Sequence, residues 1–127
     1  MSSGIKIYKI KDFIRKNESG EIDFDKSMQM VRELAAAVMS HGSHNILIDL
    51  RETTTSVDRM DEVMRIVMAF VQLMPSFKNK IANVIPHDAN RVAGAEQFEA
   101  CMQIKEFQYK FFTEFEHAIE WLSDIVT

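Results

Sequence analysis

Cysteine, proline and glycine are scarce in this sequence. Its 127 residues include one cysteine, Cys101, together with two prolines and four glycines. A single cysteine excludes an internal disulfide framework, and a reducing, cytoplasmic compartment is therefore expected. No internal repeat, low-complexity tract or interdomain linker interrupts the pattern, so residues 1–127 are predicted to form one domain.

Long apolar runs and blocks of basic residues are also missing. The longest mostly apolar stretch, residues 63–74, contains Arg65 and Gln72 and is too short to span a bilayer. Residues 1–6 lack the apolar segment of a signal peptide. The formal net charge is -4 and the basic residues are dispersed, so a nucleic-acid partner is not expected.

What the sequence does contain is an alternation of strand-like and helix-like apolar patterns. Residues 5–10 alternate apolar and polar side chains, which predicts a half-buried strand. Residues 13–16 are a candidate second strand, and with the turn-like residues 17–20 they predict an N-terminal antiparallel pair. Three further strands are predicted at residues 45–50, 80–85 and 108–112. The first two of these are continuous apolar runs, which are typical of strands covered on both faces.

Helices are predicted between and after these strands. Asp23 or Asp25 begins the first by accepting backbone N–H groups, and Gly42 suits its C-terminal end. The second has its apolar face on residues 60–74, and Pro75 ends it. The third follows the polar residues after the strand at 80–85. Each helix therefore connects two strands, as in βαβ units.

Two capping boxes are predicted at helix starts, and the order of all the elements predicts the fold class. The boxes pair Thr55 with Asp58 and Thr113 with Glu116, at the starts of the second and fourth helices. The fourth helix is predicted to reach Ile125. The order of elements implies an α/β fold with a mixed, mostly parallel sheet of about five strands and about four helices.

The first candidate site follows the central strand. It contains Thr53, Thr54, Thr55, Ser56 and Asp58. Open α/β sheets bind ligands at the carboxyl ends of their strands, and helix N-termini attract anions. The hydroxyls are therefore candidates for binding a phosphate or for being phosphorylated. The alternative is that Thr55 or Ser56 simply caps the helix within a polar loop. No glycine-rich phosphate cradle is present.

The second candidate site follows the strand at residues 80–85. His87 and Asp88 suit an acid/base pair if a substrate lies within hydrogen-bond reach, with Arg91 nearby. The alternative is a turn that provides a helix cap and solvated charges. Cys101 has no adjacent histidine or basic residue to activate it, and no complete metal-ligand set is recognisable. No enzyme activity, metal or cofactor is therefore expected.

Three segments together resemble a known family. They are residues 45–51 (NILIDLR), 80–85 (KIANVI) and 112–122 (FTEFEHAIEWL). In this order they resemble SpoIIAA-like proteins of the STAS/SEC14-type superfamily, which are small α/β domains. Among these, anti-sigma-factor antagonists carry an Asp-Ser-Ser-Gly motif after the central strand, and phosphorylation of its serine switches binding. Ser56 is the nearest positional match to that serine, followed by Thr55, although the Ser-Gly pair is absent here.

The resemblance implies two functions. The leading hypothesis is a non-enzymatic cytoplasmic regulatory or interaction domain that binds a partner protein through residues 52–58, flanked by residues 87–91. Self-association as a homodimer is a further expectation. SEC14-type domains instead enclose lipophilic ligands beneath a mobile helix. The alternative is therefore a binding module for a small hydrophobic or lipid-like ligand under the Met-rich helix at residues 58–77.

Overall fold

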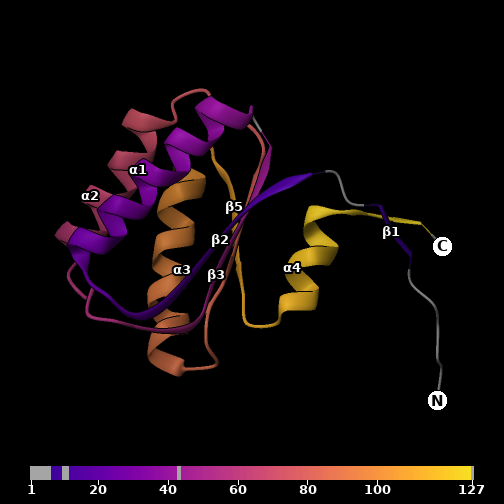
Figure 1. Ribbon diagram of the computed structural model, residues 1–127. Coiled ribbons are helices and arrows are strands. Elements are labelled where there is room, and N and C mark those ends of the chain that lie inside the picture. Colours follow the sequence, from indigo (N-terminus) through magenta and orange to yellow (C-terminus); the bar gives the residue numbers. More distant parts are fainter. Residues whose placement is uncertain (1–6, 10–11, 43, 127) are drawn as a thin grey trace, which may run out of the picture.

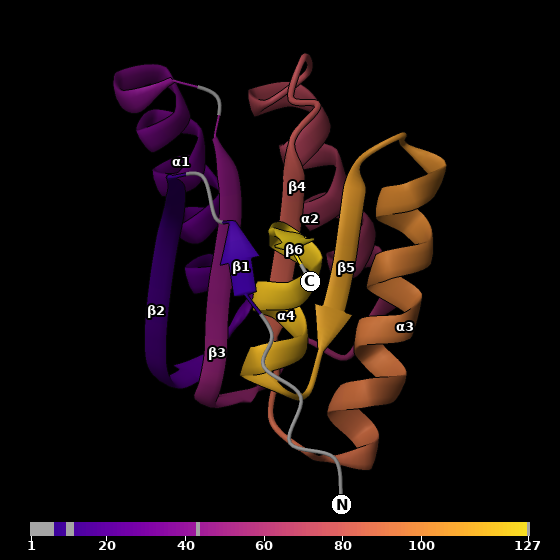
Figure 2. The ribbon, with the colours of Figure 1, turned by 90° about the vertical axis from the view of Figure 1, so that its right-hand side faces the viewer.

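Four parallel strands form the central sheet of the structure, a computed structural model that describes residues 7–9, 12–42 and 44–126. Their order is β2-β3-β4-β5, from left to right in Figure 2. The strands are β2 (Phe13–Ile22), β3 (Asn45–Thr55), β4 (Lys80–Val84) and β5 (Gln108–Phe112). A helix connects each strand to the next, because parallel neighbours require a crossover connection.

Helices cover both faces of this sheet (Figure 1). Three of them form one layer: α1 (Phe24–His41), α2 (Met60–Leu73) and α3 (Ala89–Ile104). The opposite face carries α4 (Phe115–Leu122). Next to α4, β1 (Ile7–Lys9) and β6 (Asp124–Val126) form a separate antiparallel pair. None of the helices in these described ranges combines the length and apolar character needed to cross a membrane.

The N-terminal antiparallel pair predicted from residues 5–10 and 13–16 is wrong. β1 pairs with β6, and β2 pairs with β3 in parallel, so the main sheet has four parallel strands rather than five mixed ones. Alternating side chains identify a strand but not its partner, which is selected by packing against the rest of the chain. Residues 5, 6 and 10 of the predicted pair lie outside the described residues.

The turn predicted at residues 17–20 is also wrong, because β2 continues through it. The register between β2 and β3 shifts between Asn17 and Ser19, and Gly20 has φ +82°. An extra residue in one strand produces a bulge, and glycine adopts positive φ without the steric clash of a side chain. The turn-like residues 17–20 thus lie beside an irregularity in the pairing, where β3 carries the extra residue.

The ends of α1 agree with the prediction. The Asp23 carboxylate accepts a hydrogen bond from the Lys26 amide at 2.8 Å. At the other end Gly42 has φ +88°, and its N–H donates to the Val38 carbonyl at 2.9 Å. A carboxylate cap and a C-terminal glycine satisfy backbone groups that the helix itself leaves unpaired.

Both predicted capping boxes are wrong, namely Thr55 with Asp58 and Thr113 with Glu116. The N-cap of α2 is Arg59 and that of α4 is Glu114, and neither makes a side-chain capping bond. Thr55 lies in β3 instead, where its hydroxyl donates to the Ile22 carbonyl at 3.1 Å. The predicted loop at residues 52–58 is therefore strand up to Thr55. The last helix is shorter than predicted, because α4 ends at Leu122 and β6 follows.

The core has two layers, one on each face of the sheet. Within β4, Ile81 belongs to the cluster beneath α1, α2 and α3, whereas Ala82 and Val84 belong to the cluster beneath α4. Residues 46–50 of β3 are all buried, as the continuous apolar run predicted. Successive side chains in a strand point to opposite faces, so Asn83 lies on the same face as Ile81. A polar amide therefore sits between the sheet and the three-helix layer.

Candidate functional site

A cavity of about 710 Å³ opens between the three-helix layer and the sheet. α1 and α2 line it on one side, α3 on the other, and β3, β4 and β5 contribute to its floor. Small-molecule pockets in proteins have volumes of about 300–1,000 Å³. The cavity is therefore large enough to hold a small ligand.

Aliphatic and aromatic side chains supply much of the cavity wall. α2 contributes Ile66 and Phe70, and α3 contributes Phe98. The Phe98 ring contacts Phe70 and Tyr109 edge-on, with centroids 6.2 Å and 5.1 Å apart. Such edge-to-face pairs favour fixed ring orientations. The methionines of α2 are not part of this wall, and Met60 and Met68 among them are exposed.

Most of the predicted site residues line this cavity. They are Thr53, Thr54, Thr55, Asp58, Asp88 and Arg91, from the end of β3, the segment before α2 and the start of α3. A parallel sheet places the carboxyl ends of its strands at one edge, which brings these segments together. The predicted site residues therefore lie together at the carboxyl ends of the strands. The binding role of these residues stays a prediction.

Arg91 connects α3 to β3 at this edge. Its guanidinium donates to the Thr53 carbonyl at 2.9 Å and to the Thr53 hydroxyl at 3.1 Å. Thr53 is buried, and its hydroxyl donates in turn to the Leu50 carbonyl at 2.7 Å. Burial lowers the pKa of Arg91, and the nearby Asp88 carboxylate opposes this shift. No described residue forms an ion pair with Arg91, so neutral oxygens hold the guanidinium.

Asn83 and Tyr109 form a polar pair in the cavity floor that the sequence analysis did not single out. The Asn83 amide nitrogen donates to the Tyr109 hydroxyl at 2.6 Å. The Asn83 amide oxygen is buried and has no hydrogen-bond partner among the described residues. Burial raises the pKa of the Tyr109 phenol, so it stays protonated. The available signal was an asparagine within the otherwise apolar strand KIANVI.

His87 and Ser56 lie outside the cavity lining. The His87 ring pairs with the Glu114 carboxylate, and both side chains are exposed. The Asp88 carboxylate accepts the Arg91 amide at 2.9 Å and caps α3. His87 and Asp88 therefore have separate partners, and Asp88 takes the capping role that was the alternative to an acid/base pair. Ser56 is exposed just after β3.

The described residues contain no group of three or more His, Cys, Asp or Glu side chains that could hold a metal ion. His44 instead places a ring nitrogen 2.8 Å from the His41 carbonyl. Cys101 is partly buried and packs against the core. His41, His44 and Cys101 accordingly make contacts within the protein that a structural role explains.

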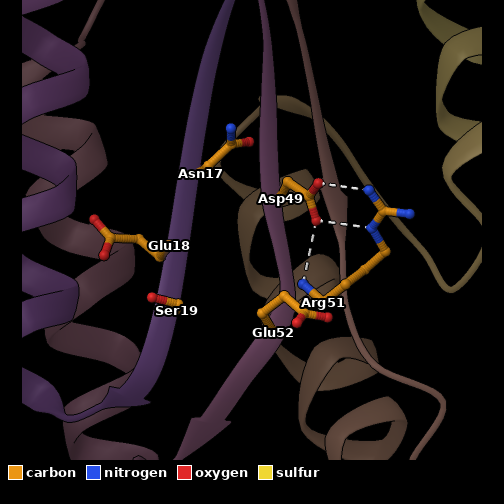
Figure 3. Close-up of a pocket in the computed structure, with 6 residues that line it drawn as sticks. All are labelled: Asn17, Glu18, Ser19, Asp49, Arg51 and Glu52. Atoms are coloured by element: carbon orange, nitrogen blue, oxygen red, sulfur yellow. Dashed lines mark hydrogen bonds and ion pairs between the residues drawn. The ribbon is translucent and has the colours of Figure 1, made fainter.

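A second hollow, of about 570 Å³, lies beside β2 and β3 and is shown in Figure 3. It is lined by Asn17, Glu18, Ser19, Asp49, Arg51 and Glu52. The Asp49 carboxylate faces the Arg51 guanidinium, with contacts of 2.9 Å and 2.8 Å (Figure 3). Arg15 adds a third contact at 3.2 Å. Hydrogen bonding by Arg51 lowers the pKa of Asp49 despite its burial.

Both of these arginines also contact α4. The Arg15 and Arg51 guanidinium carbons lie 4.9 Å and 4.8 Å from the centre of the Phe115 ring. A cation over an aromatic face is attracted by the ring quadrupole. Because Asp49 and Phe115 already engage the guanidiniums, we interpret these arginine contacts as structural, attaching α4 to the sheet.

Comparison with known proteins supports the fold. A solved structure of an uncharacterised protein of the DUF3478 family from Shewanella loihica PV-4, described as having a SpoIIAA-like fold, is similar to this chain with a TM-score of 0.52. The match covers 96% of this chain and 98% of that chain at 19% sequence identity. No protein-family model and no curated protein matches the sequence. The SpoIIAA-like fold predicted from three sequence segments is thereby confirmed, at the level of fold alone.

Proposed function

We propose that this protein is a binding module for a small, mostly apolar molecule, which it holds in the cavity beneath α2. The observation that supports this is the 710 Å³ cavity itself, with a wall built around Ile66, Phe70 and Phe98. Protein interiors are close-packed, and voids larger than a water molecule are few. An apolar ligand that fills this space gains about 25 cal/mol for each Å² removed from water.

The proposal concerns binding rather than catalysis. The His87 ring lies outside the cavity lining and pairs with Glu114, and Asp88 caps α3. Arg91 is engaged with Thr53. Because these polar groups already bind structural partners, the cavity presents mainly apolar surface to a ligand. Such a surface suits binding.

Binding is tested with heptyl methyl ether, a neutral apolar probe. Titration into isotopically labelled protein should shift the backbone amide NMR signals of cavity residues such as Phe70 and Phe98. Native mass spectrometry of freshly purified protein should also show a co-purified small molecule. The proposal would be contradicted if the amide signals of cavity residues did not shift at the highest soluble probe concentration and the native mass showed no bound molecule.

A cavity-filling variant provides the matched control. A Cβ built on Gly94, which lines the cavity, meets no heavy atom within 4 Å, so Gly94→Phe can be accommodated without a clash at Cβ. Ala100 lies on the same helix, is exposed and does not line the cavity. Gly94→Phe should weaken probe binding at least about tenfold, the equivalent of 1.4 kcal/mol, whereas Ala100→Phe should not. Equal binding by the two variants would place the probe elsewhere.

Partner binding through residues 52–58 is a second candidate function, and the exposure of Ser56 favours it. The Ser56 side chain makes no hydrogen bond to a described residue, so its hydroxyl is available for phosphorylation. The Thr55 hydroxyl, in contrast, donates to Ile22 and accepts from the Val57 amide at 3.1 Å. A phosphate on Ser56 would add negative charge beside Asp58 and reorganise this surface.

This second function is tested by intact mass after incubation with kinase-containing cell extract. One added phosphate is expected on the wild type and on Thr54→Ala, but not on Ser56→Ala. If the wild type stays unmodified under conditions that phosphorylate an anti-sigma-factor antagonist, the hypothesis of a phosphorylation switch is rejected.

A further inference from the structure

The Asn83–Tyr109 pair gives the cavity a specific hydrogen-bonding requirement. Asn83 lines the cavity and is only partly buried, whereas its amide oxygen is buried without a partner among the described residues. A buried polar atom without a partner is costly, and a ligand group that satisfies it would bind favourably. The terminal torsion of asparagine is broad, so the amide can turn toward the cavity within its rotamer well.

The pair offers at least one donor and one acceptor, whichever way the amide is oriented. With the amide nitrogen donating to Tyr109, the phenol proton is still available as a donor and the amide oxygen as an acceptor. With the amide turned over, the phenol donates to the amide oxygen. The phenol oxygen is then the acceptor, and the amide nitrogen is the donor. A third group that both donates and accepts would satisfy either arrangement.

Charge at the cavity mouth restricts the ligand further. The charged lining residues are Asp58, Asp88 and Arg91, so the lining carries two carboxylates and one guanidinium. The guanidinium is already bound to Thr53. An excess of carboxylates in the lining does not favour an anionic ligand. A ligand carboxylate could accept a hydrogen bond from the Asn83–Tyr109 pair but could not donate one to it. A neutral hydroxyl, which carries both a donor and an acceptor, fits the pair and the mouth.

We infer that the ligand is a neutral apolar alcohol whose hydroxyl binds between Asn83 and Tyr109, with its apolar body between α2 and α3. This inference rests on the proposed binding function and adds the chemical class of the ligand. The aromatic wall from Phe70 to Phe98 borders Tyr109, so the apolar body and the hydroxyl have adjoining sites.

Two isomeric probes isolate the hydroxyl. Octanol and heptyl methyl ether contain the same atoms, but only the alcohol can donate a hydrogen bond. We expect octanol to bind about fivefold more tightly than the ether, as one net hydrogen bond would produce. The side-chain amide NMR signals of Asn83 should shift with octanol and much less with the ether. Equal affinities for the two isomers would overturn the inference.

A double variant tests whether the pair causes this preference. Asn83→Leu with Tyr109→Phe replaces both partners by apolar groups of similar shape, a change that proteins tolerate better than loss of one partner. In this variant the ratio of octanol affinity to ether affinity should fall to about one, whatever the absolute affinity for either probe. A preference that persists in the double variant would assign the hydroxyl to another site.

The remaining outcomes separate this inference from the proposed function. If neither isomer binds the wild type, the binding function and the alcohol both fail. If both bind equally well and Gly94→Phe blocks both, the cavity binds ligands but the alcohol inference fails alone. Tighter binding of octanoate than octanol would replace the alcohol by an anion held at Arg91.

Discussion

Arg91 of α3 holds Thr53 of β3 through two hydrogen bonds, at 2.9 Å to the carbonyl and 3.1 Å to the hydroxyl. The two residues are 38 positions apart in the chain, and both line the cavity. Because Thr53 is buried, its oxygens depend on protein donors rather than on water. The contact therefore fixes the distance between α3 and the sheet where the cavity opens.

Arg91→Ala should destabilise the protein by about 1–3 kcal/mol, because it leaves buried Thr53 oxygens without a donor. Urea unfolding followed by circular dichroism measures this change. Arg59→Ala is the matched control, since the Arg59 side chain is 70% exposed and pairs with the exposed Asp61. The control should change stability by less than about 0.5 kcal/mol. Similar losses for both arginines would show that the Thr53 contact contributes little.

Gly94→Ala should stabilise the protein by about 0.5–1 kcal/mol. Gly94 lies inside α3, and an added Cβ meets no heavy atom within 4 Å, so alanine adds helix propensity without a clash. Gly20→Ala should have the opposite effect, by about 1–2 kcal/mol, because φ at Gly20 is +82°. Thermal unfolding should show a higher melting temperature than the wild type for Gly94→Ala and a lower one for Gly20→Ala. A loss of stability in Gly94→Ala would mean that the glycine is needed for close packing.

The elements of the fold could largely be predicted from local patterns, whereas their pairing could not. The continuous apolar runs at residues 45–50 and 80–85 correctly predicted buried strands, and Asp23 correctly predicted the start of α1. An apolar run and a helix cap each involve residues that are close together in the sequence. The pairing of β1 with β6 joins segments from opposite ends of the chain, and no local pattern encodes it.

The same limit applies to the site. Thr53 and Arg91 were singled out because each was predicted to follow a strand, and their proximity at the carboxyl ends of the strands follows from parallel topology. The Asn83–Tyr109 pair was missed because it joins β4 to β5 through a register that only the assembled sheet defines. The capping box at Thr113 was wrongly predicted because its sequence pattern also fits a strand end followed by an uncapped turn.

Phe115→Leu should weaken the attachment of α4 to the sheet. Arg15 and Arg51 both place their guanidinium carbons within 5 Å of the Phe115 ring centre, at 4.9 Å and 4.8 Å. Each cation–π contact at such a site contributes about 0.5–1 kcal/mol. A double-mutant cycle of Phe115→Leu with Arg15→Met should therefore give a coupling of about that size. The control cycle with Arg32→Met, on exposed α1 surface, should give none; equal couplings would remove the cation–π explanation.

Asp49→Asn should reduce stability at neutral pH but not in strong acid. Hydrogen bonding from Arg51 lowers the pKa of Asp49 in the folded protein, against an unfolded value of about 3.9. A group with a lowered folded pKa stabilises the protein above its unfolded pKa, and this contribution is lost as the pH falls through the folded pKa. The Asp49 side chain is only 11% exposed, so a loss of about 1–3 kcal/mol is expected at pH 7.

Urea unfolding of the wild type and of Asp49→Asn at about pH 7 and about pH 2 checks this sign. The stability difference between the two proteins should be largest at the higher pH and should shrink at the lower one, where Asp49 becomes protonated. Asp61→Asn is the control, because its pair with Arg59 is exposed and should contribute less than about 1 kcal/mol at either pH. A difference for Asp49→Asn that stays constant between the two pH values would show that the amide loses packing rather than charge, and that the Asp49–Arg51 pair does not supply the stabilisation.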